Sequence, residues 1–125
     1  CDIRFVAREA KLAFAHVRRG VPPDAHSHWT VPRAIGFART AELFLTGRHV
    51  TGEEAASMGL VSRAFPAVEV QGAALATARD IAINCAPLSV ALSKRLLWEG
   101  RSLTREDIGQ RETAYHHVVM GRPEA

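Results

Sequence analysis

The alternation of apolar and polar positions predicts two short strands at the start of the chain. Apolar side chains gather within residues 1–6 and again within residues 12–14, and the more polar stretch AREAK separates the two groups. Short apolar runs interrupted by polar residues are typical of strands around a turn. Because a two-stranded ribbon is only marginally stable in water, we expect these strands to complete a sheet whose other strands lie before Cys1.

From residue 34 onward the apolar positions recur at helical spacing, and the residues that flank them are typical of helix ends. Gly47 suits a helix C-terminus, and Pro87 suits the first turn of a helix. Capping boxes lie at Thr51 with Glu54 and at Thr104 with Asp107. The sequence predicts helices over residues 34–46, 52–58, 68–84, 87–99 and 104–120, the last ended by Gly121 and Pro123, and a short strand or extended connection over residues 60–65.

Residues 16–33 break this regularity and hold most of the side chains capable of chemistry. Gly20 admits a positive φ, whereas the consecutive Pro22 and Pro23 fix φ and lack an N–H group. The segment carries three of the six histidines of the chain, together with one aspartate and one tryptophan. We predict a loop over residues 16–33, and because loops held by rigid elements commonly carry sites, we expect the functional site there.

Composition narrows the class of protein. The 125 residues are 47% hydrophobic and 23% charged, which is typical of one globular domain or part of one. The net charge of +3 comes mostly from scattered arginines, which suit an anionic small molecule as well as nucleic acid. Two cysteines without a framework spacing indicate a reduced, cytoplasmic protein, and no apolar run reaches the length of a membrane span. The start at Cys1 rather than at Met suggests a fragment.

Short matches along almost the whole chain carry a family resemblance. They are Cys1-Asp2-Ile3, Pro32-Arg33, Ile35-Gly36, Leu45-Thr46-Gly47, Glu54-Ala55, Gly59-Leu60-Val61 and Ala86-Pro87-Leu88. In this order and spacing they resemble the second half of the crotonase (enoyl-CoA hydratase/isomerase) family. Residues 18–29 are further similar to a subgroup with RRG, P-E-A and Ser-x-Trp motifs, with Asp24 in place of the glutamate.

The resemblance implies an α+β fold that is mostly helical. Residues 1–66 are then the end of a crotonase-like ββα spiral, with an active-site loop over residues 16–33. Residues 67–125 are a C-terminal helical region that mediates trimerisation. The assembly implied for the full-length protein is a homotrimer or a dimer of trimers.

The resemblance also implies that the substrate is an acyl-CoA thioester. No separate cofactor is expected, because coenzyme A enters as part of the substrate. Members of the family stabilise an enolate with two backbone N–H groups, an oxyanion hole. These groups, and the first catalytic carboxylate of the hydratases, belong to segments that precede Cys1, so we expect the chain alone to be inactive. Metal, nucleic acid and membrane are not expected as partners.

Two residues are the candidate catalytic groups. His16 matches the position of the second hydratase glutamate, and Asp24 matches the catalytic aspartate of dienoyl-CoA isomerases. A histidine and a carboxylate can act together as a general acid and base. His16 stands in place of one of the two glutamates that share the work of standard hydration. The structural alternative is that His16 ends an edge strand and bonds to backbone, while Asp24 caps the loop or the following helix.

Other side chains in residues 16–33 have two interpretations each. Arg18 and Arg19 can bind CoA phosphates or form ordinary ion pairs. Three histidines suit zinc, so His16, His26 and His28 form a possible metal set, although polar histidines facing solvent or substrate are the simpler interpretation. Trp29 is expected to pack under the loop rather than to stack on an adenine.

Three functions compete. The leading hypothesis is the C-terminal half of an enzyme that hydrates or isomerises an acyl-CoA through enolate chemistry, in fatty acid metabolism. The second is a non-catalytic piece of the same fold that mediates oligomerisation. The third is a basic nucleic-acid binder, because residues 54–61 resemble the turn of a helix-turn-helix, but the extended pattern of residues 60–66 leaves no recognition helix.

Overall fold

The computed structural model describes residues 1–120. Gly121 and Pro123, the expected end of the last helix, lie outside these residues. The chain separates into two compact units, residues 1–75 and the part from residue 76 onward, so the division lies inside the helix over residues 70–84. None of the helices within residues 1–120 combines the length and the apolarity that crossing a membrane requires.

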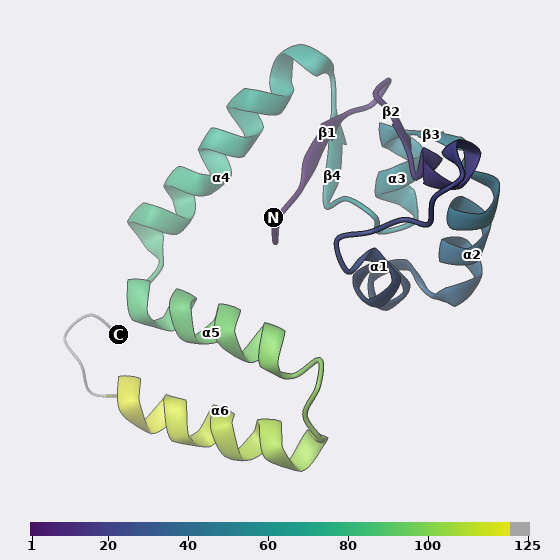
Figure 1. Cartoon of the computed structure of the whole chain (residues 1–125). Helices are drawn as coiled ribbons and strands as arrows, with labels where there is room; N and C mark the ends of the chain where they lie inside the picture. The colour runs from purple at the N-terminus through teal and green to yellow at the C-terminus, as the bar shows by residue number, and fades with distance from the viewer. Residues whose placement is uncertain (121–125) are drawn as a thin grey trace. The chain divides into compact units, whose positions relative to one another are not determined.

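The first unit alternates short strands and short helices (Figure 1). Its elements are β1 (Phe5–Ala7), β2 (Lys11–Ala13), the 3-10 helix η1 (Ala15–Arg19), α1 (Ser27–Ile35), α2 (Phe37–Thr46), β3 (His49–Thr51), α3 (Gly52–Ser57), β4 (Arg63–Phe65) and the 3-10 helix η2 (Ala67–Glu69). Helix α4 (Val70–Asn84) begins in this unit, and α5 (Pro87–Glu99) and α6 (Arg105–Val119) belong to the second.

The first two strands exist as predicted, but they do not pair with each other. Strand β1 pairs in parallel with β4, and β2 pairs antiparallel with β3. Strand β3 was absent from the expectation, because three residues between a glycine and a capping box carry too short a pattern to detect. Residues 63–65 are extended, as expected, so no recognition helix follows the turn at Gly59.

The expectation of a loop over residues 16–33 and of one helix over residues 34–46 is wrong in detail. Only residues 20–26 lie outside helices in that loop, because η1 and α1 occupy the remainder. The single helix is two helices that meet at Gly36, whose φ of 82° lies in the left-handed region open to glycine. The Gly36 N–H closes α1 by donating to Pro32, and its carbonyl accepts from Thr40 at the start of α2.

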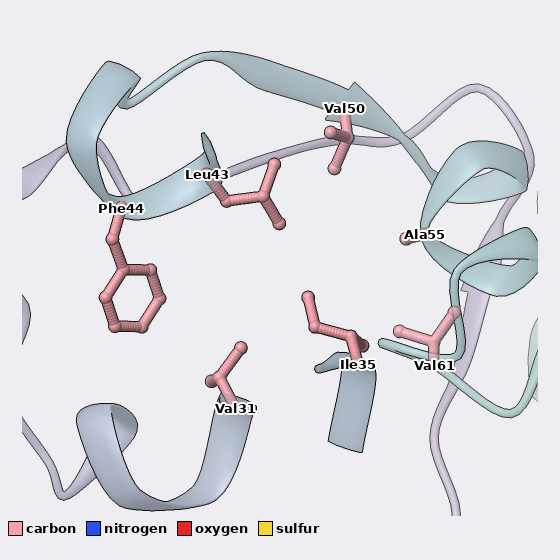
Figure 2. Packing of buried hydrophobic residues seen from close by; sticks show 7 residues of the cluster. All are labelled: Val31, Ile35, Leu43, Phe44, Val50, Ala55 and Val61. Atoms are coloured by element: carbon pink, nitrogen blue, oxygen red, sulfur yellow. The ribbon is translucent and has the colours of Figure 1, made fainter. Parts of the chain in front are cut away.

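The core of the first unit lies between these helices and the two small sheets. Figure 2 shows the buried side chains pointing toward one another from α1, α2, β3, α3 and the turn before β4. They are Val31, Ile35, Leu43, Phe44, Val50, Ala55 and Val61. The core therefore fixes α1 and α2, the two helices that flank residues 20–26.

Gly52 permits the closest approach of backbone segments in this unit. It is buried at the first position of α3, and a Cβ atom there would lie 1.9 Å from the carbonyl oxygen of Ala7. The next residue, Glu53, donates its N–H to the carbonyl of Arg8 at 3.1 Å. Helix α3 therefore begins directly against the end of β1, which leaves room for no side chain.

Arg48 connects the end of α2 to the start of α3. Its guanidinium contacts the carboxylates of Glu42 and Glu54, each at 2.6 Å. The hydrogen bond from Arg48 holds the pKa of Glu54 below its usual value. The Thr51 hydroxyl accepts from the Glu54 N–H, which confirms the N-cap of the predicted capping box.

The second unit consists of helices joined by short turns. Pro87 begins α5 as predicted, and the Thr104 hydroxyl caps α6 by accepting from the Asp107 N–H. Glu99 of α5 accepts from Arg95 and from Arg111 of α6, and both bonds lower the pKa of its carboxyl. No residue of α4, α5 or α6 that the structure describes is buried.

Replacing Gly52 with alanine should destabilise the fold, because the new Cβ cannot coexist with the Ala7 carbonyl oxygen. We expect a loss of about 3 kcal/mol or more in the free energy of unfolding, measured by denaturant titration. Gly72→Ala is the matched control, since a Cβ at this helical position meets nothing within 4 Å and alanine favours a helix by about 1 kcal/mol. Equal losses in the two variants would show that the close approach is not the cause.

The Glu54 carboxylate should make stability depend on pH. A lowered carboxyl pKa stabilises the fold above the pKa of the unfolded chain, and this stabilisation is lost as pH falls through the pKa of the folded state. We therefore expect Glu54→Gln to lower Tm at pH 7 and the difference from the parent to vanish in acid. Glu53→Gln, in the same helical turn, is the control. A gap between the parent and Glu54→Gln that stays constant down to pH 2 would disprove the ion pair's contribution.

Candidate active site

His16 lies in η1, directly after β2. The turn that follows reverses the chain at Gly20, which has a φ of 78°. The Val21 N–H donates to the His16 carbonyl at 3.2 Å and closes this turn. His16 is therefore not at the end of an edge strand, and its carbonyl is tied to the segment that leads to Asp24.

Arg18 fastens η1 to the core. Its Nε donates to the carbonyl of Thr46 at 2.8 Å, where α2 ends and carbonyl groups lack helical partners. Gly47 makes room for this side chain, because a Cβ there would lie 3.1 Å from Cγ of Arg18. Of the two interpretations of Arg18, the structure supports a structural role, but the bond caps a helix rather than pairing with a carboxylate.

Asp24 lies between the buried Pro23 and the start of α1. Its carbonyl accepts from the Ser27 N–H at 2.9 Å. Helix α1 has no side-chain cap, and its N-cap residue is His26, so the alternative in which Asp24 caps this helix is wrong. The Asp24 carboxylate is instead directed toward η1.

The structure brings the two candidate catalytic residues together. Nε2 of His16 lies 3.8 Å from Oδ1 of Asp24. This separation allows an electrostatic contact but is too long for a direct hydrogen bond, and catalytic hydrogen bonds are often long in structures without substrate. The side chains are 39% and 86% exposed, respectively, so reacting molecules can reach both.

The other ring nitrogen of His16 faces the interior. Within the part of the chain that the structure describes, buried Nδ1 has no hydrogen-bond partner, and the same holds for Oγ of Ser27. A proton on Nε2 faces the Asp24 carboxylate, whereas a proton on Nδ1 would face no acceptor. The tautomer with its proton on Nε2 is the one that places an N–H donor beside a carboxylate.

His26 and His28 do not join His16. The ring of His28 packs edge-on against Phe44 of the core, with ring centroids 5.0 Å apart. Across residues 1–120, no three His, Cys, Asp or Glu side chains gather in a geometry that could hold a metal ion. The histidines of this segment therefore have different surroundings, although they are close in the sequence.

Trp29 does not pack under the loop as expected. It is 38% exposed, and the guanidinium of Arg33 lies over its ring at 4.2 Å. Arg33 also donates to the Trp29 carbonyl at 2.9 Å. The side chains of Trp29 and Arg33, which are one helical turn apart on α1, therefore contact each other rather than the loop.

Two residues of the site had no signal in the sequence. Ala25 and His26 have φ values of 52° and 57°, in the left-handed region that side chains with a Cβ rarely adopt. Such a conformation costs on the order of 1–2 kcal/mol per residue. A glycine at these positions would have indicated a positive φ, but alanine and histidine do not. Only the backbone geometry identifies this strained turn directly after Asp24.

Comparisons with known proteins agree with this fold. The family described as "Enoyl-CoA hydratase/isomerase" matches residues 1–119. An enoyl-CoA hydratase of Alternaria alternata is 40% identical over 98 residues, which are 78% of this chain and 33% of that protein. The human mitochondrial enoyl-CoA hydratase domain-containing protein 2 is 37% identical over 97 residues, 75% of this chain and 33% of its own length.

Solved structures extend the likeness to nearly the whole chain. A probable enoyl-CoA hydratase/isomerase from Mycobacterium abscessus matches with a TM-score of 0.97 and 47% identity over 99% of this chain and 49% of that one. An enoyl-CoA hydratase from Bacillus anthracis matches with a TM-score of 0.92 and 30% identity, over 98% of this chain and 47% of that one. The chain thus spans about half the length of these structures and about a third of the curated relatives.

Proposed function

The chain belongs to the enoyl-CoA hydratase/isomerase family, also called the crotonase family, and we propose that the protein carrying it hydrates or isomerises an acyl-CoA thioester. In this proposal His16 and Asp24 transfer the protons. The observation that carries it is the 3.8 Å approach of His16 Nε2 to the Asp24 carboxylate, in a segment accessible to a substrate.

His16 and Asp24 supply the acid and the base that hydration or isomerisation of an acyl-CoA requires. The Asp24 carboxylate acts as the base, and the Nε2–H group of His16 acts as the acid. In an isomerisation, the base removes a proton from one carbon of the acyl chain and the acid returns a proton to another. In a hydration, the base activates water and the acid protonates the α-carbon. Enolate stabilisation by backbone N–H groups outside this chain completes the mechanism.

The same proposal assigns the chain a place in the parent protein. Residues 1–66 correspond to the end of the crotonase spiral with the site, and residues 67–125 to a C-terminal region for trimerisation. Coverage of about half of the matched structures supports the chain being one part of a longer protein. The free, exposed Cys1 and Cys85 support a reducing compartment such as the cytoplasm.

A second candidate is a non-catalytic piece that mediates oligomerisation. The helices α4 to α6 favour it, because they expose large apolar side chains, with Ile83 78% and Leu97 75% accessible. Oligomerisation and catalysis are compatible, so only the activity of the protein separates the two candidates.

In the protein that carries this chain, His16→Ala and Asp24→Asn should each lower kcat on an acyl-CoA by at least roughly tenfold, the lower range of what acid–base groups contribute. His49→Ala is the control, because it removes an exposed histidine from β3 in the same unit. Steady-state kinetics on a panel of enoyl-CoA esters measures the effect. Full turnover by both variants would make the segment structural and remove the proposed roles.

The chain of 125 residues by itself should show no saturable turnover of acyl-CoA. The reason is chemical: without the oxyanion-hole donors, an enolate has no stabilisation to compensate for its charge. Incubation with enoyl-CoA esters, followed by mass spectrometry of the products, tests this expectation. Saturable product formation that disappears in His16→Ala would overturn the requirement for further segments.

A further inference from the structure

We infer that the strained turn at Ala25 and His26 is a positioning device, which holds the Asp24 carboxylate opposite His16 at the expense of stability. His26 is a positioning residue in this scheme and makes no contact with the substrate. The inference rests on the proposed roles of His16 and Asp24, and extends them to the backbone that aims one of them.

The turn is unusual in its residue types. Ala25 and His26 are the residues other than glycine with positive φ within residues 1–120. They follow one another, and together they join Asp24 to the first residue of α1. Left-handed conformations of residues with a Cβ persist only where the surroundings impose them, and such strain gathers at functional sites.

The surroundings that impose this conformation lie on both sides of the turn. Pro23, before it, is buried and has a fixed φ. After it, the His26 carbonyl accepts from the N–H groups of Trp29 and Thr30, both at 3.0 Å, as α1 begins. Helix α1 is in turn held by Val31 and Ile35 in the core. Ala25 and His26 bridge these two anchors, and both adopt the left-handed conformation there.

The backbone is what directs the Asp24 side chain. Among residues 1–120 the carboxylate accepts no hydrogen bond, and its one ion-pair contact is the 3.8 Å approach to His16. An 86% exposed carboxylate without hydrogen bonds is free to adopt several rotamers, so the direction of its Cα–Cβ bond decides how often it faces the imidazole. That direction is set by the conformation of the turn.

A glycine at position 26 would relieve the backbone strain of the turn but would also make its backbone more flexible. Glycine adopts left-handed and right-handed conformations about equally readily, so the turn would fold with less strain and then sample more orientations of Asp24. A Cβ at position 26 narrows that sampling. The device therefore predicts opposite effects on stability and on turnover from a single substitution to glycine, and it predicts that asparagine, which keeps a Cβ, preserves turnover.

The test is made in the full protein that carries this chain. We expect His26→Gly to raise Tm by roughly 2–4 °C, as relief of strain in a protein the size of the matched structures would do, and to lower kcat by threefold or more with KM little changed. His26→Asn should retain kcat, because asparagine tolerates the left-handed region and keeps a Cβ. His26→Val should lower both Tm and kcat, because a β-branched residue does not fit this conformation.

A double-mutant cycle separates positioning from other effects. In the Asp24→Asn background, His26→Gly should lower kcat no further, because the group that it positions is already inactive. A rise in Tm with unchanged kcat, a fall in Tm, a loss of kcat in His26→Asn, or an additional loss of kcat in the Asp24→Asn background would each overturn the inference. Full activity of Asp24→Asn itself would refute the proposed function instead, and the inference with it.

Discussion

The contact of Gly52 with the Ala7 carbonyl oxygen is the constraint on which the first unit depends. It allows α3 to begin where β1 ends, and it places Ala55 at the centre of the core with no exposed surface. The two sheets are each only two short strands, and such ribbons have little stability of their own. Their stability comes from sharing one core with α1, α2 and α3, and a larger residue at position 52 would separate them from it.

The site inherits its geometry from this core through two connections. Arg18 links η1, and with it His16, to the end of α2, whereas α1 holds the turn that carries Asp24. Helices α1 and α2 meet at Gly36 and bury side chains in the same cluster. The distance between imidazole and carboxylate is thus set by packed helices rather than by a bond between the two side chains. Such an arrangement leaves both side chains accessible to other molecules.

The sequence predicted the features that short segments determine by themselves, such as helix starts, but not those that depend on distant segments, such as strand pairing. Thr51, Thr104 and Pro87 act within one helical turn, so the sequence located the helices that they begin. The partners of β1 and β2 lie far along the chain, and the period of a strand does not identify its neighbour. The break at Gly36 was missed because an isolated glycine also occurs within helices. The pairing of His16 with Asp24 came from family resemblance, since eight residues of irregular chain fix no distance.

The two units differ in how their helices are stabilised. The helices of the first unit bury side chains, which is the main source of helix stability in proteins. Those of the second have local support: the Thr104 cap, and Glu99 held between Arg95 and Arg111. Such exposed ion pairs contribute little each. Two 15-residue and one 13-residue helix without buried residues among those described therefore gain most from any further surface that covers Leu97 and its apolar neighbours. The physical demand for that surface is independent of the contact between His16 and Asp24, which lies wholly within the first unit.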